Sequence, residues 1–177
     1  DRRGNRSPGF APHGCYRCQG EDAWVTIAVA DDQEWQALCR VAGYPEWAQD
    51  SRFTDTLLRE QNQDALDQLI QGWTRGQTPE EVSNLLQSAG VAAGPSMSGQ
   101  DLAEDGHLKA RGVWQEVLHP VMGVQTVQGP PWNLSQTPAA VRSPGPLLGQ
   151  HNQYVLRELL GSSGTKLAEW IQEGTVA

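Results

Sequence analysis

The sequence predicts an α/β fold, and three observations support that prediction. The apolar run WVTIAV at 24–29 has the length and character of a buried strand. Several later segments space their apolar residues three or four positions apart, as amphipathic helices do. Residues 113–134 have the pattern of two extended segments, one on each side of a turn at 119–123.

The chain opens with a loop, rich in glycine and proline, that leads directly into the strand at 24–29. Its glycines permit backbone angles that a side chain would forbid, and its prolines hold φ near one value. These residues are Gly4, Gly9, Gly14, Pro8 and Pro12. Loops carried on rigid elements often form binding surfaces. We therefore take this loop as the first candidate site.

Helix signals follow the strand in order. Asp31 and Asp32 should cap a helix that ends at Gly43, and a short turn from 44 leads to Phe53, which is expected in the core. A longer helix should begin at Thr54 or Thr56 and present its apolar stripe as far as Trp73.

The next helix has a capping box, formed by Thr78, Pro79 and Glu81, and should run to Gly90. Further elements are predicted by apolar spacing and by breaker residues. They are a short strand at 91–95, a helix at 99–112, two extended segments within 113–134, a proline-rich linker at 136–146, and helices at 151–160 and 165–171.

Size and charge limit the possible functions. The 177 residues suffice for one domain or two small lobes. The net charge of −8 and the pI near 4.9 argue against a nucleic-acid surface, and no apolar run is long enough for a membrane helix. Three cysteines suit a reducing cytoplasm. The one basic cluster is Arg2, Arg3 and Arg6, which either meets an anionic ligand or forms a solvated terminus.

The residues with reactive side chains form no catalytic pattern. Cys15 and Cys18 make a CxxC near His13 and Cys39, but a structural zinc site needs four paired ligands, and alternate side chains on an extended chain diverge. The other histidines, at 107, 119 and 151, lie in separate segments and suit capping or surface roles. Glu21 and Asp22 adjoin each other but should face apart, and the sequence has no nucleophile elbow or phosphate loop.

Four blocks of the chain resemble the family III CoA-transferases. This group includes formyl-CoA transferase, the carnitine CoA-transferases and, as a sister branch, the α-methylacyl-CoA racemases. The blocks keep the family's order and spacing over nearly the whole chain. They are GNRSPGFAPHGCYRCQGEDAWVTIAV (4–29), EWQALCRVAGYPEWAQDSRF (34–53), AGVAAGPSMSGQDLAEDGHLKARGVWQEVLHP (89–120) and GPPWNLSQTPAAVRSPGPLLGQHNQYVLRELLG (129–161).

The resemblance implies an enzyme that moves CoA between an acyl-CoA and a carboxylic acid through an aspartyl-CoA thioester. It implies no cofactor besides the CoA thioester substrate. In formyl-CoA transferase a glycine-rich loop covers the reacting groups, and the matching positions make Gly9, Phe10 and Ala11 the expected substrate contacts. This loop has a single glycine and the bulky Phe10 where formyl-CoA transferase has several glycines. That departure suggests a different or larger acyl group than formate or oxalate.

The family's nucleophilic aspartate lies in an N-terminal half that has no counterpart here. None of Asp22, Asp31, Asp32 and Asp55 matches it, so no catalytic residue and no metal ligand is assigned. The chain alone is expected to be inactive. By resemblance, residues 1–95 are the later part of the family's small domain, with the active-site loop. Residues 96–177 are a crossing segment and a tail that returns to the large domain. Full-length members form interlocked homodimers.

Other readings stay open. An α-methylacyl-CoA racemase would have the same fold, with proton abstraction next to the thioester in place of acyl exchange. A non-catalytic binding module is a second alternative, and a zinc or redox module is a third. The leading expectation is a cytoplasmic CoA-transferase fragment that binds neither nucleic acid nor membranes.

Overall fold

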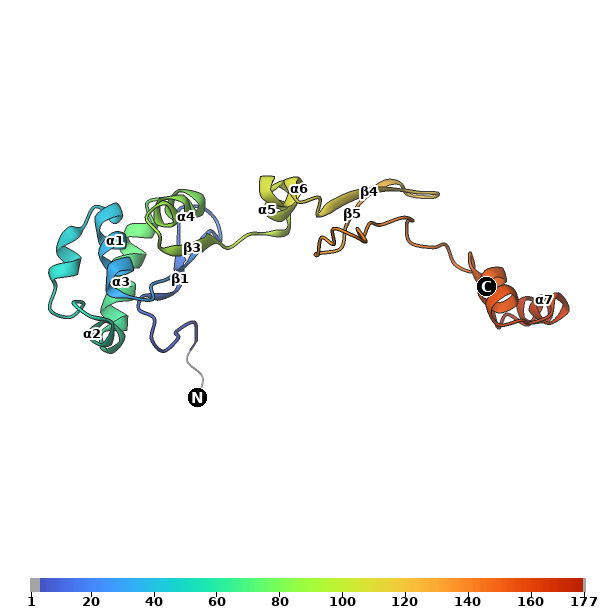
Figure 1. The fold of residues 1–177 in the computed structure, drawn as a ribbon, viewed down its shortest axis with the longest axis horizontal. Coiled ribbons are helices and arrows are strands. Elements are labelled where there is room, and N and C mark those ends of the chain that lie inside the picture. Colours follow the sequence, from blue (N-terminus) through green and yellow to red (C-terminus); the bar gives the residue numbers. More distant parts are fainter. Residues whose placement is uncertain (1–3, 177) are drawn as a thin grey trace. The chain divides into compact units, whose positions relative to one another are not determined.

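The computed structural model describes residues 4–176. The chain forms two compact units, and along the sequence the boundary falls between Ser98 and Gly99. Their order along the sequence can be followed from blue to red in Figure 1. The fold class is the α/β class that the sequence predicts. The assignment of residues 1–95 and 96–177 to parts of a larger protein stays a prediction.

The first unit is built on a three-stranded antiparallel sheet in the order β1-β2-β3. The strands are β1 (His13–Arg17), β2 (Trp24–Ala28) and β3 (Ala92–Pro95). Strands β2 and β3 confirm the predicted ones. Strand β1 was not predicted, because its HGCYR sequence places only Tyr16 in the core and so lacks apolar alternation.

Helices α1 and α4 agree with their local signals. Helix α1 (Asp32–Ala42) begins at Asp31, whose carboxylate accepts from the Glu34 N–H, and ends at Gly43 with φ +85°. A 3-10 helix, η1 (Pro45–Gln49), follows and leads to the fully buried Phe53. In helix α4 (Pro79–Ser88) both hydrogen bonds of the predicted capping box are present.

The single helix predicted from residue 54 to 73 is two helices, α2 (Thr56–Gln61) and α3 (Gln63–Thr74). The first is capped by Asp55, which accepts from the Leu58 N–H, and not by either threonine. At Asn62 the backbone leaves the helical region, with ψ 26°. The Asn62 side chain donates to the Leu58 carbonyl at 2.8 Å, and such local bonds compete with helix continuation.

One hydrophobic core joins the helices to one face of the sheet. Strands β1 to β3 contact helices α3 and α4, while Thr26 on the opposite face of β2 stays exposed. Side chains exposed by 2% or less hold this core together, among them Val25, Ile27, Val29, Trp35, Leu38, Phe53, Leu66, Ile70, Val82 and Leu86.

The second unit has short elements. The predicted helix at 99–112 is two helices, α5 (Gly99–Glu104) and α6 (Gly106–Ala110), because Asp105 turns the backbone to ψ 126° and caps α6. Strands β4 (Trp114–His119) and β5 (Gly123–Gln128) form the predicted hairpin. The proline-rich run at 136–146 has no helix or strand. A π-helix, η2 (Gln153–Leu159), and helix α7 (Gly164–Gln172) occupy the two last predicted helical segments.

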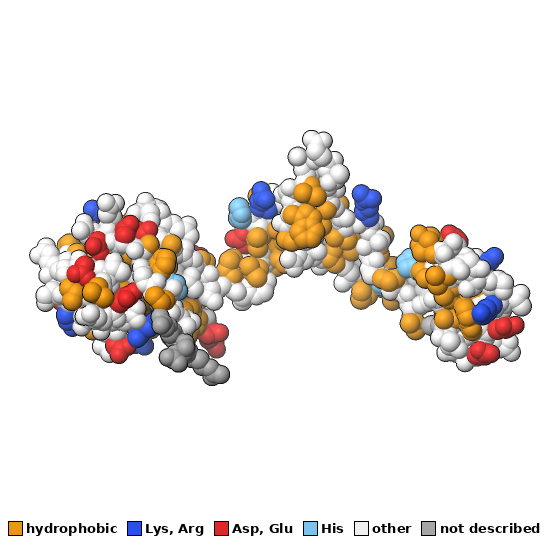
Figure 2. Space-filling model, turned by 60° about the horizontal axis from the view of Figure 1, so that its bottom comes forward, with side chains coloured by type: hydrophobic (Ala, Val, Ile, Leu, Met, Phe, Trp, Pro, Cys, Tyr) orange, Lys and Arg blue, Asp and Glu red, His pale blue; other side chains and the backbone are white. Residues whose placement is uncertain are grey.

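Hydrophobic side chains are exposed over much of the second unit, as the orange atoms in Figure 2 show. Examples are Leu118, Val121, Met122, Val124 and Leu148. Among residues 4–176, no helix combines the length and apolar character that a membrane crossing requires.

The capping box of α4 gives a first prediction. We expect Thr78→Ala to lower the free energy of unfolding of the first unit by about 1 kcal/mol, because the Glu81 N–H loses its acceptor. Urea titration followed by circular dichroism measures the change. Thr54→Ala is the control, since Thr54 is exposed outside a helix, and it should stay within about 0.5 kcal/mol. Equal losses in both variants would contradict a role for the cap.

Candidate functional site

The loop at 7–12 precedes strand β1 and presents its tip to solvent. The Phe10 N–H donates to the Ser7 carbonyl at 3.3 Å and closes the turn. Gly9 has φ +81°, a left-handed conformation that glycine adopts without strain. Gly9 is exposed and Phe10 is 37% exposed, so both lie where a ligand could meet them.

The base of the loop is fixed to the sheet at Ala11. The Ala11 side chain is fully buried, and its N–H donates to the Val29 carbonyl at 3.1 Å. The Val29 N–H in turn donates to the Pro12 carbonyl at 2.9 Å, and the Ala11–Pro12 peptide is cis. Ala11 therefore holds the loop in place, while Gly9 and Phe10 form its accessible part.

A buried arginine supports this base. The Arg59 side chain is 0% exposed, and its Nε donates to the Ala11 carbonyl at 2.8 Å. Its other nitrogens donate to the Phe53 carbonyl and to Thr56 Oγ1, and one forms an ion pair of 2.8 Å with Asp32. One guanidinium thus joins the loop to α1 and α2, an arrangement that its planar set of donors permits.

Sequence reasoning missed Arg59. A signal did exist, because Arg59 lies seven positions before Leu66 and so falls on the apolar stripe of the single helix that the sequence predicts. The Arg59 guanidinium also lies over the Trp35 ring in a cation–π contact, with 5.6 Å between its central carbon and the ring centre. A charged residue on an apolar stripe is thus a candidate for a buried hydrogen-bonding role.

The segment before the loop and the loop tip are both held by α2 and α3. The Gly9 N–H donates to the Glu60 carboxylate. Arg6 pairs with Asp64 at 2.6 Å and with Asp67 at 2.8 Å, and these hydrogen bonds raise the pKa of its guanidinium. Arg2 and Arg3, the rest of the predicted basic cluster, lie outside the described residues. Arg6 is therefore engaged with carboxylates of its own chain.

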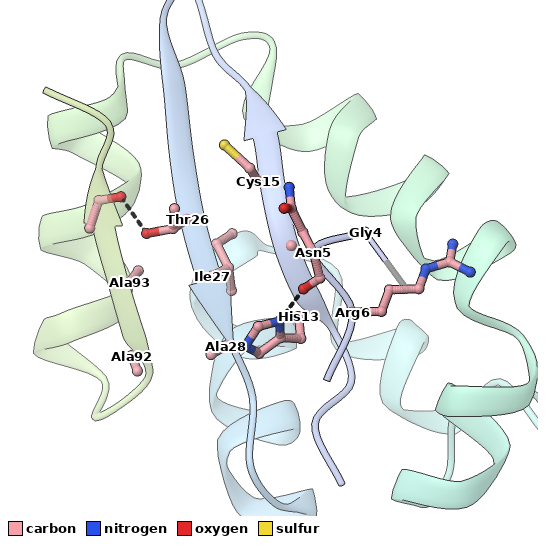
Figure 3. Close-up of a pocket in the computed structure, with 12 residues that line it drawn as sticks. Gly4, Asn5, Arg6, His13, Cys15, Thr26, Ile27, Ala28, Ala92 and Ala93 are labelled. Carbon is pink, nitrogen blue, oxygen red and sulfur yellow. Dashed lines mark hydrogen bonds between the residues drawn. The ribbon is translucent and has the colours of Figure 1, made fainter. Parts of the chain in front are cut away.

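A hollow of about 840 Å³ lies on the uncovered face of the sheet (Figure 3). Its floor is made of small side chains in register across the strands, with Cys15 opposite Thr26 and Thr26 opposite Gly94. Asn5 and Arg6 border it on the β1 side. Small residues on three adjacent strands leave space for an extended ligand close to the backbone.

His13 stands between this hollow and the loop. Its Nδ1 is hydrogen-bonded to the Asn5 carbonyl oxygen, which can only accept, so Nδ1 carries a proton. In the neutral ring Nε2 is then an acceptor. The Phe10 and His13 rings pack in a T-shaped arrangement, with 5.7 Å between ring centres and 65° between planes. This contact places the loop tip beside the cavity.

The two cysteines of the CxxC lie in different surroundings. Cys15 lines the hollow, whereas Cys18 is in the hydrophobic core, and neither forms a disulfide. Within residues 4–176, no three His, Cys, Asp or Glu side chains gather closely enough to hold a metal ion. Burial raises the pKa of all three thiols, Cys18 to about 11 and Cys39 to about 12.

The raised thiol pKa values predict the order of chemical labelling. At pH 8 we expect iodoacetamide to modify Cys15 first and to leave Cys18 and Cys39 unmodified until urea unfolds the first unit, because the buried thiols stay protonated and inaccessible. Peptide mass spectrometry at timed intervals measures this order. Labelling of Cys39 at the rate of the unfolded chain would contradict the burial.

The same thiols set a dependence of stability on pH. Cysteines of the unfolded chain lose their protons near pH 9, whereas Cys39 in the folded unit keeps its proton up to about pH 12. Between these values the unfolded state binds fewer protons, so the contribution of Cys39 to stability should be constant below pH 9 and fall as the pH rises above it. Cys39→Ala should reduce the alkaline fall in stability, and a urea series from pH 7 to 11 tests it.

The four aspartates that do not match the family's nucleophile, Asp22, Asp31, Asp32 and Asp55, all have structural partners. Asp31 and Asp55 cap α1 and α2, and Asp32 pairs with Arg59. Asp22 accepts from the Trp24 indole N–H at 2.8 Å. The roles predicted for Gly9, Phe10 and Ala11 in substrate binding stay predictions, since no ligand contact tests them.

Comparison with known proteins gives the relationships of the chain. Residues 1–152 match the model of CoA-transferase family III. The chain is 34% identical over 167 residues to a probable CoA-transferase, Rv1866, of Mycobacterium tuberculosis, covering 94% of this chain and 21% of that protein. It is 31% identical over 179 residues to formyl-CoA:oxalate CoA-transferase of Rhodopseudomonas palustris, covering 99% of this chain and 42% of the relative.

The fold agrees with the same relationship. A crystal structure of a CAIB/BAIF family protein from Brucella suis superposes with a TM-score of 0.76 at 27% identity, covering 89% of this chain and 40% of that one. Succinyl-CoA–D-citramalate CoA-transferase of Chloroflexus aurantiacus is 33% identical over 168 residues, covering 95% of this chain and 42% of that protein. This chain thus spans at most about two fifths of the length of these relatives.

Proposed function

We propose, from the premise that this chain belongs to CoA-transferase family III, that it is the part of a CoA-transferase that covers the reacting thioester. The enzyme would move CoA from an acyl-CoA to a carboxylic acid, with the CoA thioester as substrate and no further cofactor. Residues 1–95 would be the later part of a small domain, and residues 96–177 a segment that returns to a large domain. The observation that carries the proposal is the loop tip at Gly9 and Phe10.

The structure of the loop at 7–12 suits a segment that shields a bound ligand. Its base is rigid, because the Ala11 backbone is bonded to Val29 and to the buried Arg59. Its tip is exposed and lies beside the sheet-face hollow through the contact of Phe10 with His13. A rigid base with an exposed tip suits a segment whose tip closes over a ligand while its base stays fixed to the sheet.

The proposed reaction uses a carboxylate nucleophile outside this chain. An aspartate attacks the acyl-CoA carbonyl and releases CoA thiolate, leaving a mixed anhydride. The thiolate then attacks the aspartyl carbonyl, which gives an aspartyl-CoA thioester and frees the donor acid. The acceptor carboxylate attacks that thioester, and the thiolate released attacks the acceptor's acyl carbon in the new anhydride. This step forms the new acyl-CoA and restores the aspartate.

Both anhydrides hydrolyse if water reaches them, so exclusion of water is the task left to this chain. The Phe10 ring supplies an apolar surface at the tip. The Gly9 N–H is engaged by Glu60 in this arrangement, so it is not free to stabilise an oxyanion unless that bond opens. We therefore assign the loop to shielding and the nucleophile to another part of the enzyme.

The proposal also includes a homodimer and a cytoplasmic location. The apolar side chains exposed on the second unit support association with further protein surface. Three free cysteines support a reducing compartment.

A chimera tests the function. This chain replaces the matched region of formyl-CoA:oxalate CoA-transferase from Rhodopseudomonas palustris, and chromatography follows CoA transfer from formyl-CoA and succinyl-CoA to a panel of acids. We expect transfer by the chimera, none by the 177-residue chain alone, and an enzyme-bound thioester that hydroxylamine converts to a hydroxamate. Transfer by the chain alone would overturn the assignment of the nucleophile. Deuteration of a 2-methylacyl-CoA in D₂O without an acceptor acid would favour the racemase instead.

A further inference from the structure

A second cavity, of about 340 Å³, lies within the second unit, between α6 and the strands of the hairpin. It shares no residue with the sheet-face hollow and has no part in the proposed function. Its size is that of a small-molecule site. Its lining combines apolar side chains with two basic ones and two amides: Leu102, His107, Leu108, Arg111, Val113, Trp114, Gln128, Pro130, Pro131 and Asn133.

The charge of this lining differs from that of the chain. The sequence has 21 acidic residues against 13 Lys and Arg, yet no carboxylate lines this cavity. Arg6, at the sheet-face hollow, is paired with two aspartates. Arg111 forms no ion pair within residues 4–176, so its guanidinium is available to an anion from outside.

The two basic side chains come from one helix turn. His107 and Arg111 are four positions apart at α6, a spacing that brings side chains to the same side of a helix. The backbone N–H of Arg111 donates to the His107 carbonyl at 2.9 Å, which fixes this turn. A planar guanidinium with an imidazole beside it can bind a carboxylate through several hydrogen bonds.

The apolar walls are held in place. The Trp114 indole N–H donates to the Leu102 carbonyl at 3.0 Å, which fixes the ring plane. The Gly129 N–H donates to the Val113 carbonyl at 2.7 Å and keeps the two prolines that follow beside strand β4. A fixed indole and two proline rings form flat apolar surfaces, which suit an aromatic ring.

We propose that this cavity binds a small aromatic carboxylate. The carboxylate pairs with the Arg111 guanidinium, His107 contributes a second donor, and the ring packs on Trp114. One free cation matches one negative charge, which favours a carboxylate over a doubly charged phosphate. Because the chain has a net charge of −8, the attraction for an anion comes from this local pair of side chains.

The test uses 2-naphthoate as the probe and the full 177-residue chain. We expect saturable binding in the millimolar range or tighter, with shifts of the backbone NMR signals confined to residues that line the cavity. The neutral 2-naphthamide tests the charge, and cyclohexanecarboxylate tests the ring. Each should bind at least tenfold more weakly, equal to about 1.4 kcal/mol.

Two variants on α6 complete the test. Arg111→Gln should weaken 2-naphthoate binding at least tenfold, while Lys109→Gln, which removes an exposed cation outside the lining, should change it by about twofold at most. Unchanged spectra elsewhere show that each variant is folded. No saturation at millimolar probe, equal binding of the amide, or equal losses in the two variants would each overturn the proposal.

Discussion

Replacing Arg59 with methionine should lower the free energy of unfolding of the first unit by about 3–5 kcal/mol. Methionine fills similar space, so the loss comes from hydrogen bonds. The Ala11 and Phe53 carbonyls would each lose a buried donor, at about 1–3 kcal/mol each. Asp32 is half exposed and can be hydrated, so its lost ion pair adds little.

The loop should respond before the unit unfolds. Without the bond from Arg59 to Ala11, the tip at Phe10 loses part of its support, and chymotrypsin should cleave after Phe10 faster than in the parent chain. Arg59→Lys should recover little, because one ammonium cannot reach all the acceptors of the guanidinium. Urea titration and timed proteolysis measure the two effects.

An exposed arginine provides the control. Arg75→Met alters a residue that follows α3 and is exposed, so it should change stability by about 0.5 kcal/mol at most and leave cleavage after Phe10 unchanged. If Arg59→Met behaved like Arg75→Met, the buried network would not support the loop.

The elements that the sequence predicts correctly are those whose caps, glycines or apolar patterns lie within the segment itself. Helix α4 begins at a capping box of adjacent residues, and α1 lies between Asp31 and a glycine with positive φ. The hairpin of the second unit and strand β2 have apolar patterns that need no distant partner. The sequence also locates the candidate loop, because closely spaced glycines and prolines have a local conformational meaning.

The misses depend on contacts that apolar spacing does not register: strand pairing, side-chain bonds to nearby backbone, and one contact between distant residues. Strand β1 is defined by pairing with β2, and only Tyr16 in it faces the core. Asn62 and Asp105 interrupt two predicted helices, and the side chain of each is bonded to nearby backbone, which apolar spacing does not register. Arg59 binds the Ala11 carbonyl from 48 residues away, a contact that only the folded chain creates.

Replacing Phe10 with glycine should raise hydrolysis of the acyl-CoA relative to CoA transfer by about tenfold in the chimera, equal to about 1.4 kcal/mol. The ring is the apolar part of the loop tip, and its loss would let water reach the anhydride. Free CoA, which hydrolysis leaves behind and transfer does not, and new acyl-CoA, counted in the same reaction by chromatography, give the ratio. Because one population of enzyme forms both products, the ratio does not depend on how much enzyme is active.

Tyr44→Gly separates shielding from a general loss of aromatic surface. Tyr44 is 41% exposed, close to the 37% of Phe10, but it stacks on Trp47 and lies outside both the loop and the hollow. It should leave the ratio unchanged. Phe10→Leu keeps an apolar side chain and should restore most of the transfer. A ratio that rises in Tyr44→Gly as well, or that leucine does not restore, would mean that the loop tip does not exclude water in the proposed reaction.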